Sequence, residues 1–319
     1  MSSVLAITVP IYLVITAGYV ATRAGLFARA EMRVFGRYVI YFSLPALLFN
    51  ALSQRSVAEV LNPVFVGVYA LGSLLAMLAG VLWARSAGKP LATAGVVGMG
   101  MACPNSGFIG FPLVLQVFGP SVAGVGLALA MVVENFLLLP LAMAISDSDM
   151  GEAGTSGTRS ERLHAALKQS LRGAVRNPMI HGVVAGFLFS LLGWHLPEPI
   201  AKAVNLLAMS TAAVSLLVIG GSLVGVRLRG MARDVAVITA GKLLLHPLAI
   251  FLMVWLLPPM QRELQIAVVL MASVPMLGIY PILAQRHHQE TLAAAAQLAA
   301  TIVSFFTLTT ALWVLQRAS

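Results

Sequence analysis

Long apolar runs separated by short polar loops fill almost the whole chain. A helix that crosses a membrane needs about 20 mostly apolar residues, and ten of the runs approach or exceed that length. The fourth and fifth runs almost fuse at Gly119-Pro120, a pair that stops one helix and starts the next. The pattern therefore predicts an all-α integral membrane protein with ten transmembrane helices, at residues 4–22, 35–54, 64–84, 92–118, 121–145, 178–194, 200–226, 234–257, 264–285 and 291–315.

Composition agrees with this pattern. Of the 319 residues, 59% are hydrophobic and only 10% are charged, whereas soluble domains are about 25% charged. The net charge of +9 would suggest nucleic acid in a soluble chain, but here the basic residues lie in short loops without interleaved aromatic residues, so we expect no nucleic-acid partner. A single cysteine, Cys103, excludes a disulfide within the chain and a zinc site built from cysteines. No basic residue precedes the first run, so we expect a retained helix rather than a signal peptide.

The basic loop residues predict the orientation in the membrane. The loops after the first, third, fifth, seventh and ninth runs hold fifteen Lys and Arg residues, and the other side holds four. Because basic loops stay in the cytoplasm, both termini are expected outside and the odd-numbered loops inside. This arrangement suits a multi-pass protein of the inner (plasma) membrane.

The central loop, 146–177, divides the chain into two five-helix halves, 1–145 and 178–319. Its second part places leucines on one helical face and basic residues on the other, which is typical of an amphipathic helix on the membrane surface. That helix is either a plain connector or a partner site. Because five is odd, the second half enters the membrane in the opposite sense, so the fold predicted is a five-plus-five inverted repeat.

Matching helix breakers test the repeat. The fourth run contains Pro104 and Gly107, and the ninth contains Pro275 and Gly278; both pairs are 171 positions apart. Proline removes a helical hydrogen bond and crowds the preceding turn, so both helices should break in mid-membrane. Free backbone groups are tolerated there only inside protein or beside water, and helix N-termini favour anions. The alternative is a pair of proline kinks without a site.

Two ionisable side chains lie within predicted spans. Glu134, beside Asn135 in the fifth, could carry a coupling proton, because removal from water favours the neutral form of a carboxyl group. Lys242, in the eighth, could bind a substrate carboxylate. Alternatively, the two form a structural pair, or Lys242 extends toward the cytoplasm. Asn50 is a polar residue of the second span that we place among the substrate contacts.

The chain resembles the auxin efflux carrier family, whose bacterial members include malonate transporter-like proteins. The likeness covers the whole chain in length and topology and rests on four segments, FSLPALLF at 42–49, PNSGFIGFP at 104–112, Asn177-Pro178 and GKLLLHP at 241–247.

This resemblance implies that the broken helices 4 and 9 cross, that helices 1, 2, 6 and 7 form a scaffold, and that the remaining helices move like an elevator. It also implies that Asn105 contacts the substrate, and a homodimer through the scaffold is plausible by analogy. In the ninth helix, Met276 stands where family members often have Asn.

Together these observations predict a secondary transporter for a small organic anion. The substrate site is expected at Pro104, Asn105, Ser106, Gly107, Pro275, Gly278, Lys242 and Asn50. Coupling would use H⁺ at Glu134 and Asn135, or Na⁺ near Asn105 and Ser106, and no other cofactor or metal is expected. The alternatives are a sodium-coupled symporter like those for bile acids, an intramembrane enzyme, or a membrane sensor.

Overall fold

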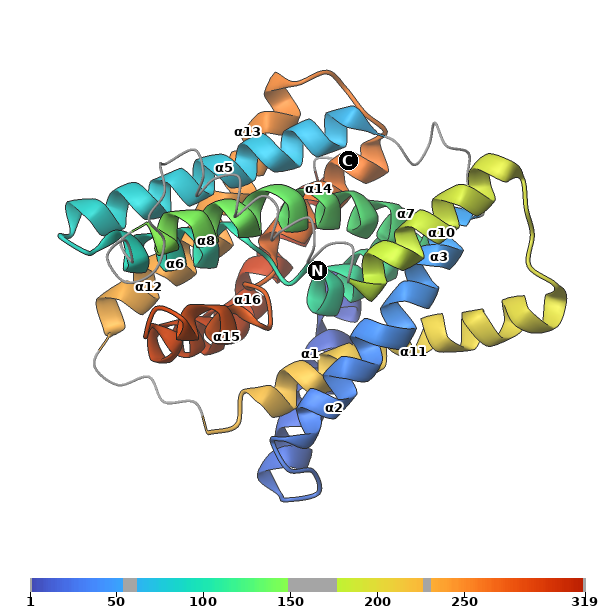
Figure 1. Ribbon diagram of the computed structural model, residues 1–319, viewed down its shortest axis with the longest axis horizontal. Coiled ribbons are helices and arrows are strands. Elements are labelled where there is room, and N and C mark those ends of the chain that lie inside the picture. The colour runs from blue at the N-terminus through green and yellow to red at the C-terminus, as the bar shows by residue number, and fades with distance from the viewer. Residues whose placement is uncertain (1, 54–61, 149–176, 226–230, 318–319) are drawn as a thin grey trace, which may run out of the picture.

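The computed structural model describes residues 2–53, 62–148, 177–225 and 231–317, and these are helical apart from short connections and one isolated backbone bridge (Figure 1). The amphipathic helix expected in the central loop lies outside the described residues. In the first half the helices are α1 (Ser2–Arg23), α2 (Glu31–Tyr38), α3 (Leu44–Ser53), α5 (Pro63–Ser86), α6 (Leu91–Ala102), α7 (Phe111–Val133) and α8 (Leu139–Asp147). In the second half they are α10 (Pro178–Leu192), α11 (Glu198–Ser222), α12 (Ala232–Ala240), α13 (His246–Leu256), α14 (Arg262–Ser273), α15 (Tyr280–Gln285) and α16 (Glu290–Arg317).

Every predicted apolar run forms helix, and within the described residues seven helices are long and apolar enough to cross a membrane. The longest, Ser106–Asp147, joins two predicted spans, and Gly119 marks the junction with φ 79° and ψ 179°. Two of the remaining apolar helices, α6 and α10, have 12 and 15 residues. The chain is therefore a helical, multi-pass integral membrane protein, while the count of ten spans stays a prediction.

Four π-helical turns interrupt the described helices, and each comes two residues before a proline. They are η1 (Val39–Ser43), η2 (Ser106–Gly110), η3 (Glu134–Leu138) and η4 (Gly241–Leu245). In each, the residue just before the proline donates its N–H to a carbonyl five positions back, as Leu139 does to Glu134. Proline cannot donate and crowds the carbonyl four residues earlier, so the wider turn relieves both problems.

The helices form two groups that meet along α7 (Figure 1). In one group, α1 packs along α11 and α3 packs along α10. Small residues allow close approach there: a Cβ added at Gly186 would lie 2.9 Å from the Phe49 carbonyl oxygen. The GxxxG of Gly182 and Gly186 thus lies at a close helix contact. In the other group, α5, α6, α8 and α12–α16 pack together, and α7 contacts both groups.

Candidate functional site

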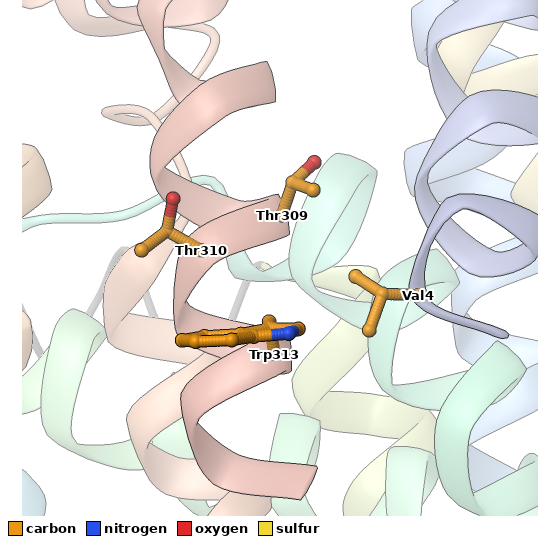
Figure 2. A pocket seen from close by; sticks show the side chains of 4 residues that line it. All are labelled: Val4, Thr309, Thr310 and Trp313. Carbon is orange, nitrogen blue, oxygen red and sulfur yellow. The ribbon is translucent and has the colours of Figure 1, made fainter. Parts of the chain in front are cut away.

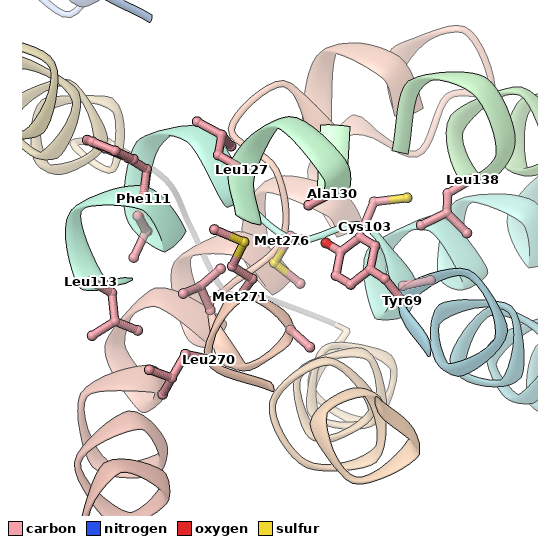
Figure 3. Packing of buried hydrophobic residues seen from close by; sticks show 14 of the residues in the cluster. Tyr69, Cys103, Phe111, Leu113, Leu127, Ala130, Leu138, Leu270, Met271 and Met276 are labelled. Atoms are coloured by element: carbon pink, nitrogen blue, oxygen red, sulfur yellow. The ribbon is translucent and has the colours of Figure 1, made fainter. Parts of the chain in front are cut away.

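The two predicted helix breaks meet, backbone to backbone. The chain leaves helical geometry between α6 and η2 and again between α14 and α15, and Pro104 pairs with Met276 as an antiparallel bridge. Asn105 donates its N–H to the Pro275 carbonyl at 2.8 Å, and Leu277 donates its N–H to the Cys103 carbonyl at 3.0 Å. Segments 171 positions apart in the sequence therefore satisfy each other's backbone groups within the apolar interior. Figure 3 shows the side chains of Cys103 and Met276, from the two paired segments, and of Met271 within the buried hydrophobic cluster.

Asn105 stands where the first break turns into helix. Its Oδ1 accepts the Phe108 N–H at 3.2 Å, which caps the N-terminus of η2. Its Nδ2 has no hydrogen-bond partner in the described structure, and with only 4% of the residue exposed it is also shielded from solvent. An unpartnered buried amide is costly, so this donor marks a place where a ligand atom or water belongs. A Cβ added at Gly278 would lie 3.7 Å from Nδ2, so this glycine leaves space beside the amide.

Glu134 lies next to Ser106 rather than alone. Its Oε1 accepts hydrogen bonds from the Ser106 hydroxyl and from the Tyr69 hydroxyl, the latter at 2.6 Å. Tyr69 also lies 3.3 Å from the Ser106 oxygen and is fully buried. These three side chains come from α5, η2 and η3, so they connect the first helix break to the middle of the fifth predicted span.

Lys242 is fully buried and held by protein groups. Its Nζ donates to the Ala272 carbonyl at 2.6 Å and lies 2.9 Å from His246 Nδ1. His246 Nε2 lies 2.9 Å from the Ser73 hydroxyl, one turn of α5 beyond Tyr69. The side chain therefore does not extend toward the cytoplasm, one of the alternatives considered from the sequence. Within the described residues no ion pair joins it to Glu134.

The remaining predicted residues, Gly107, Asn135 and Asn50, make fewer contacts with the paired helix breaks. Gly107 follows Ser106 in η2, and a Cβ added there would lie 3.3 Å from Leu44 Cδ1. Asn135 faces its own helix, with Nδ2 donating to the Met131 carbonyl at 2.9 Å. Asn50 is half-buried on α3, and within the described structure no hydrogen bond connects it to Asn105 or Glu134. The structure thus brings Pro104, Asn105, Ser106, Glu134, Pro275 and Gly278 together, with Lys242 behind the second break.

Sequence reasoning placed none of Tyr69, Ser73 and His246 in the site. All three are buried polar side chains that contact the predicted residues. The available signal was the i, i+4 spacing of Tyr69 and Ser73 on an otherwise apolar helix. His246 likewise follows Lys242 by four positions, although Lys242 lies within the π-turn η4 and His246 begins α13.

Two cavities lie away from this cluster. One, of about 240 Å³, is lined by Val4, Thr309, Thr310 and Trp313, between the start of α1 and the end of α16 (Figure 2). A larger apolar groove of about 470 Å³ runs between α12 and α16. Within the described residues, no group of three or more His, Cys, Asp and Glu side chains is arranged to hold a metal.

Comparisons with known proteins agree on one class. The chain matches the family described as "Membrane transport protein" over residues 3–314. It is 25% identical to "Uncharacterized transporter YfdV" of Escherichia coli (strain K12), over 96% of this chain and 95% of that one. It is 27% identical to a Rhizobium meliloti (strain 1021) protein named "Putative malonate transporter", over 99% and 97%. An "Uncharacterized transporter" of Methanothermobacter thermautotrophicus is 27% identical over 72% of each chain.

Proposed function

Because the chain belongs to the membrane transport protein family, that of the auxin efflux carriers, we propose that it is a secondary active transporter for a small organic anion. Membership in this family confirms the resemblance noted in the sequence and makes the chain a membrane transport protein rather than an enzyme. The substrate class, the mechanism and the coupling ion are the proposal. A carboxylate is the favoured cargo, and the Rhizobium relative named for malonate supports that class.

The observation that carries the proposal is the Asn105 amide beside the paired helix breaks. Within the described residues its Nδ2 is a buried donor without a partner, and the η2–α7 helix starts at the next residue. The first N–H groups of a helix have no acceptor within that helix, and the helix dipole favours negative charge there. A carboxylate would satisfy both the amide and the helix N-terminus, and Pro104, Ser106, Pro275 and Gly278 would shape its surroundings.

We propose a ten-helix, five-plus-five inverted repeat in which the broken helices cross at this site. The equivalent spacing of the two breaks and their antiparallel pairing support it. The scaffold would consist of α1, α2–α3, α10 and α11, and the other helices would move against it like an elevator. The close packing of α1 on α11 and of α3 on α10 supports that division. A homodimer through the scaffold, an inner-membrane location and external termini complete the proposal.

Coupling is proposed to run through Glu134. The carboxylate contacts Ser106 directly, so a proton on Glu134 changes the hydrogen bonds of the residue next to Asn105. Tyr69 fixes the same carboxylate oxygen from α5. A proton gradient would thereby be connected to the loading of the site through a single shared contact, with Asn135 as a neighbour on the same turn.

The direct test is Asn105→Ala in purified protein. We expect loss of thermal stabilisation by malonate, because the substitution removes the amide donor and the cap on η2. The wild-type protein should be stabilised by malonate or by another small carboxylate assayed in parallel. Asn205→Ala is the matched control, because Asn205 is exposed on α11 and, among the residues that the structure describes, its amide reaches only the Met209 sulfur, 3.7 Å away. Unchanged stabilisation in a folded Asn105→Ala protein would remove Asn105 from the site.

A further inference from the structure

The broken end of α14 exposes carbonyl groups that need donors. The helix ends at Ser273, and Val274 is extended at φ −77° and ψ 159°. In an uninterrupted helix the Met271 carbonyl would accept from residue 275, but that residue is proline and has no N–H. The Ala272 carbonyl would accept from residue 276, which belongs instead to the bridge with Pro104. Buried carbonyls at a helix end must be satisfied by other groups.

Lys242 supplies one such donor from another helix. Its Nζ donates to the Ala272 carbonyl at 2.6 Å, and none of the side chain is exposed. The C-terminal end of a helix carries partial negative charge, so an ammonium group is favourable there. Burying a charge among apolar residues is otherwise costly, which makes this contact the main compensation for placing a lysine at 0% exposure.

His246 and Ser73 hold the ammonium in position. An ammonium group has only donors, so His246 Nδ1 accepts from Lys242 at 2.9 Å, and the ring proton lies on Nε2. Nε2 then donates to the Ser73 hydroxyl at 2.9 Å. The Lys242, His246 and Ser73 side chains are all buried, and the ammonium group, which can only donate, fixes the direction of each hydrogen bond from η4 through α13 to α5.

We propose that Lys242 is a positioning residue, a built-in cation that caps the broken end of α14. Pro275 lies three residues after Ala272 in the chain. By holding the Ala272 carbonyl, Lys242 keeps the Pro275 carbonyl within reach of the Asn105 N–H. This inference rests on the proposed function, because the paired breaks are the proposed site. It differs from the sequence-based expectation that Lys242 binds the substrate carboxylate, since Nζ is here engaged by protein acceptors.

Hydrogen exchange tests the cap without any substrate. In Lys242→Met, a long apolar side chain keeps the packing and removes the donor. Amide exchange in peptides containing Asn105 and Leu277 should rise about tenfold or more, because a hydrogen bond from a charged group is lost. Lys89→Met is the control, because it removes a lysine that pairs with Asp234 at 2.5 Å, outside the breaks. Equal exchange in the wild type and Lys242→Met would overturn the proposal.

Chemical rescue separates capping from general damage. Lys242→Ala leaves room for a small amine, so propylammonium should return the exchange of both peptides toward the wild-type rate, whereas propanol should not. Malonate binding is measured on the same samples. Loss of malonate binding with normal exchange at both peptides would instead assign Lys242 to the substrate. If the wild-type protein binds none of the carboxylates tested, the substrate proposal is contradicted. The hydrogen-exchange result on the Lys242 cap would not be affected.

Discussion

At the scale of single residues, Glu134 is the group whose chemistry can be changed most cleanly. In Glu134→Gln the amide oxygen can still accept from Tyr69 and Ser106, so the local packing should persist. An amide cannot take up or release a proton at physiological pH. We therefore expect transport by this variant in proteoliposomes to lose its dependence on pH and on an imposed proton gradient.

Tyr69→Phe is the companion to that experiment. It removes one donor to Glu134 while leaving a carboxyl group that can be protonated, so pH dependence should remain but shift along the pH axis. If Glu134→Gln and the wild type show the same pH profile, the coupling proton is carried elsewhere.

Single residues also show how far the sequence could predict the site. Glu134 and Lys242 stand out because charged side chains in apolar runs are rare, and Asn105 lies in a distinctive motif. Their partners could not be identified in the same way. A tyrosine or a serine in an apolar helix has the same appearance in sequence whether it packs or donates, and only the folded chain brings Tyr69 to Glu134.

At the scale of elements, the connection between α15 and α16 carries a buried histidine. The His287 side chain is fully covered, and its Nε2 lies 3.4 Å from Asp147 Oδ1 at the end of α8. Burial lowers the pKa of His287 below its usual value of 6.5, the Asp147 carboxylate opposes that change, and Arg286 and His288 add to it.

This shift predicts a dependence of stability on pH. Because the folded protein binds the His287 proton more weakly than the unfolded chain does, stability is highest above about pH 6.5 and falls as the pH drops through the lowered pKa. His287→Gln should reduce the acid-induced decrease in Tm, measured by thermal unfolding across a pH series. His195→Gln is the control, because His195 is exposed. An identical pH profile for His287→Gln and wild type would contradict the assignment.

The elements themselves were largely predictable, for a physical reason. In lipid the backbone must satisfy its own hydrogen bonds, so apolar length converts directly into helix, and proline marks the places where it stops. The π-turns were not foreseen. A proline predicts a disturbance, but whether the chain breaks, as at Pro104, or widens one turn, as before Pro140 and Pro247, depends on the neighbouring helices.

At the scale of the whole molecule, the proposed elevator requires α7 and η2 to move past α3. A Cβ at Gly107 would lie 3.3 Å from Leu44 Cδ1, so cysteines at these two positions should be joined by mercury ions in a Cys103→Ala background. We expect the crosslink to stop transport in proteoliposomes and a thiol reagent to restore it.

A second cysteine pair provides the control within the scaffold. A Cβ at Gly36 would lie 3.7 Å from Val218 Cγ1, and α2 and α11 belong to the same group of helices. This crosslink should leave transport intact. Full transport by the crosslinked Leu44–Gly107 pair would show that the two groups do not need to slide.

The helical, multi-pass character of the molecule was predictable in outline from the sequence, while its division into two five-helix halves stays a prediction. The paired breaks have matching spacing, and the central loop divides the chain evenly. The backbone hydrogen bonds between the two breaks could not be predicted from the residue types. Met276 and Leu277 have apolar side chains, and the pairing uses backbone groups alone.

That backbone pairing has an evolutionary consequence. Main-chain N–H and C=O groups are the same whatever the side chain, so substitutions at Met276 and Leu277 can accumulate in a lineage without breaking the two hydrogen bonds that join the segments. Selection on cargo can then act on a few side chains while the junction itself is inherited unchanged. A lineage could in this way exchange one transported substrate for another by small mutational steps.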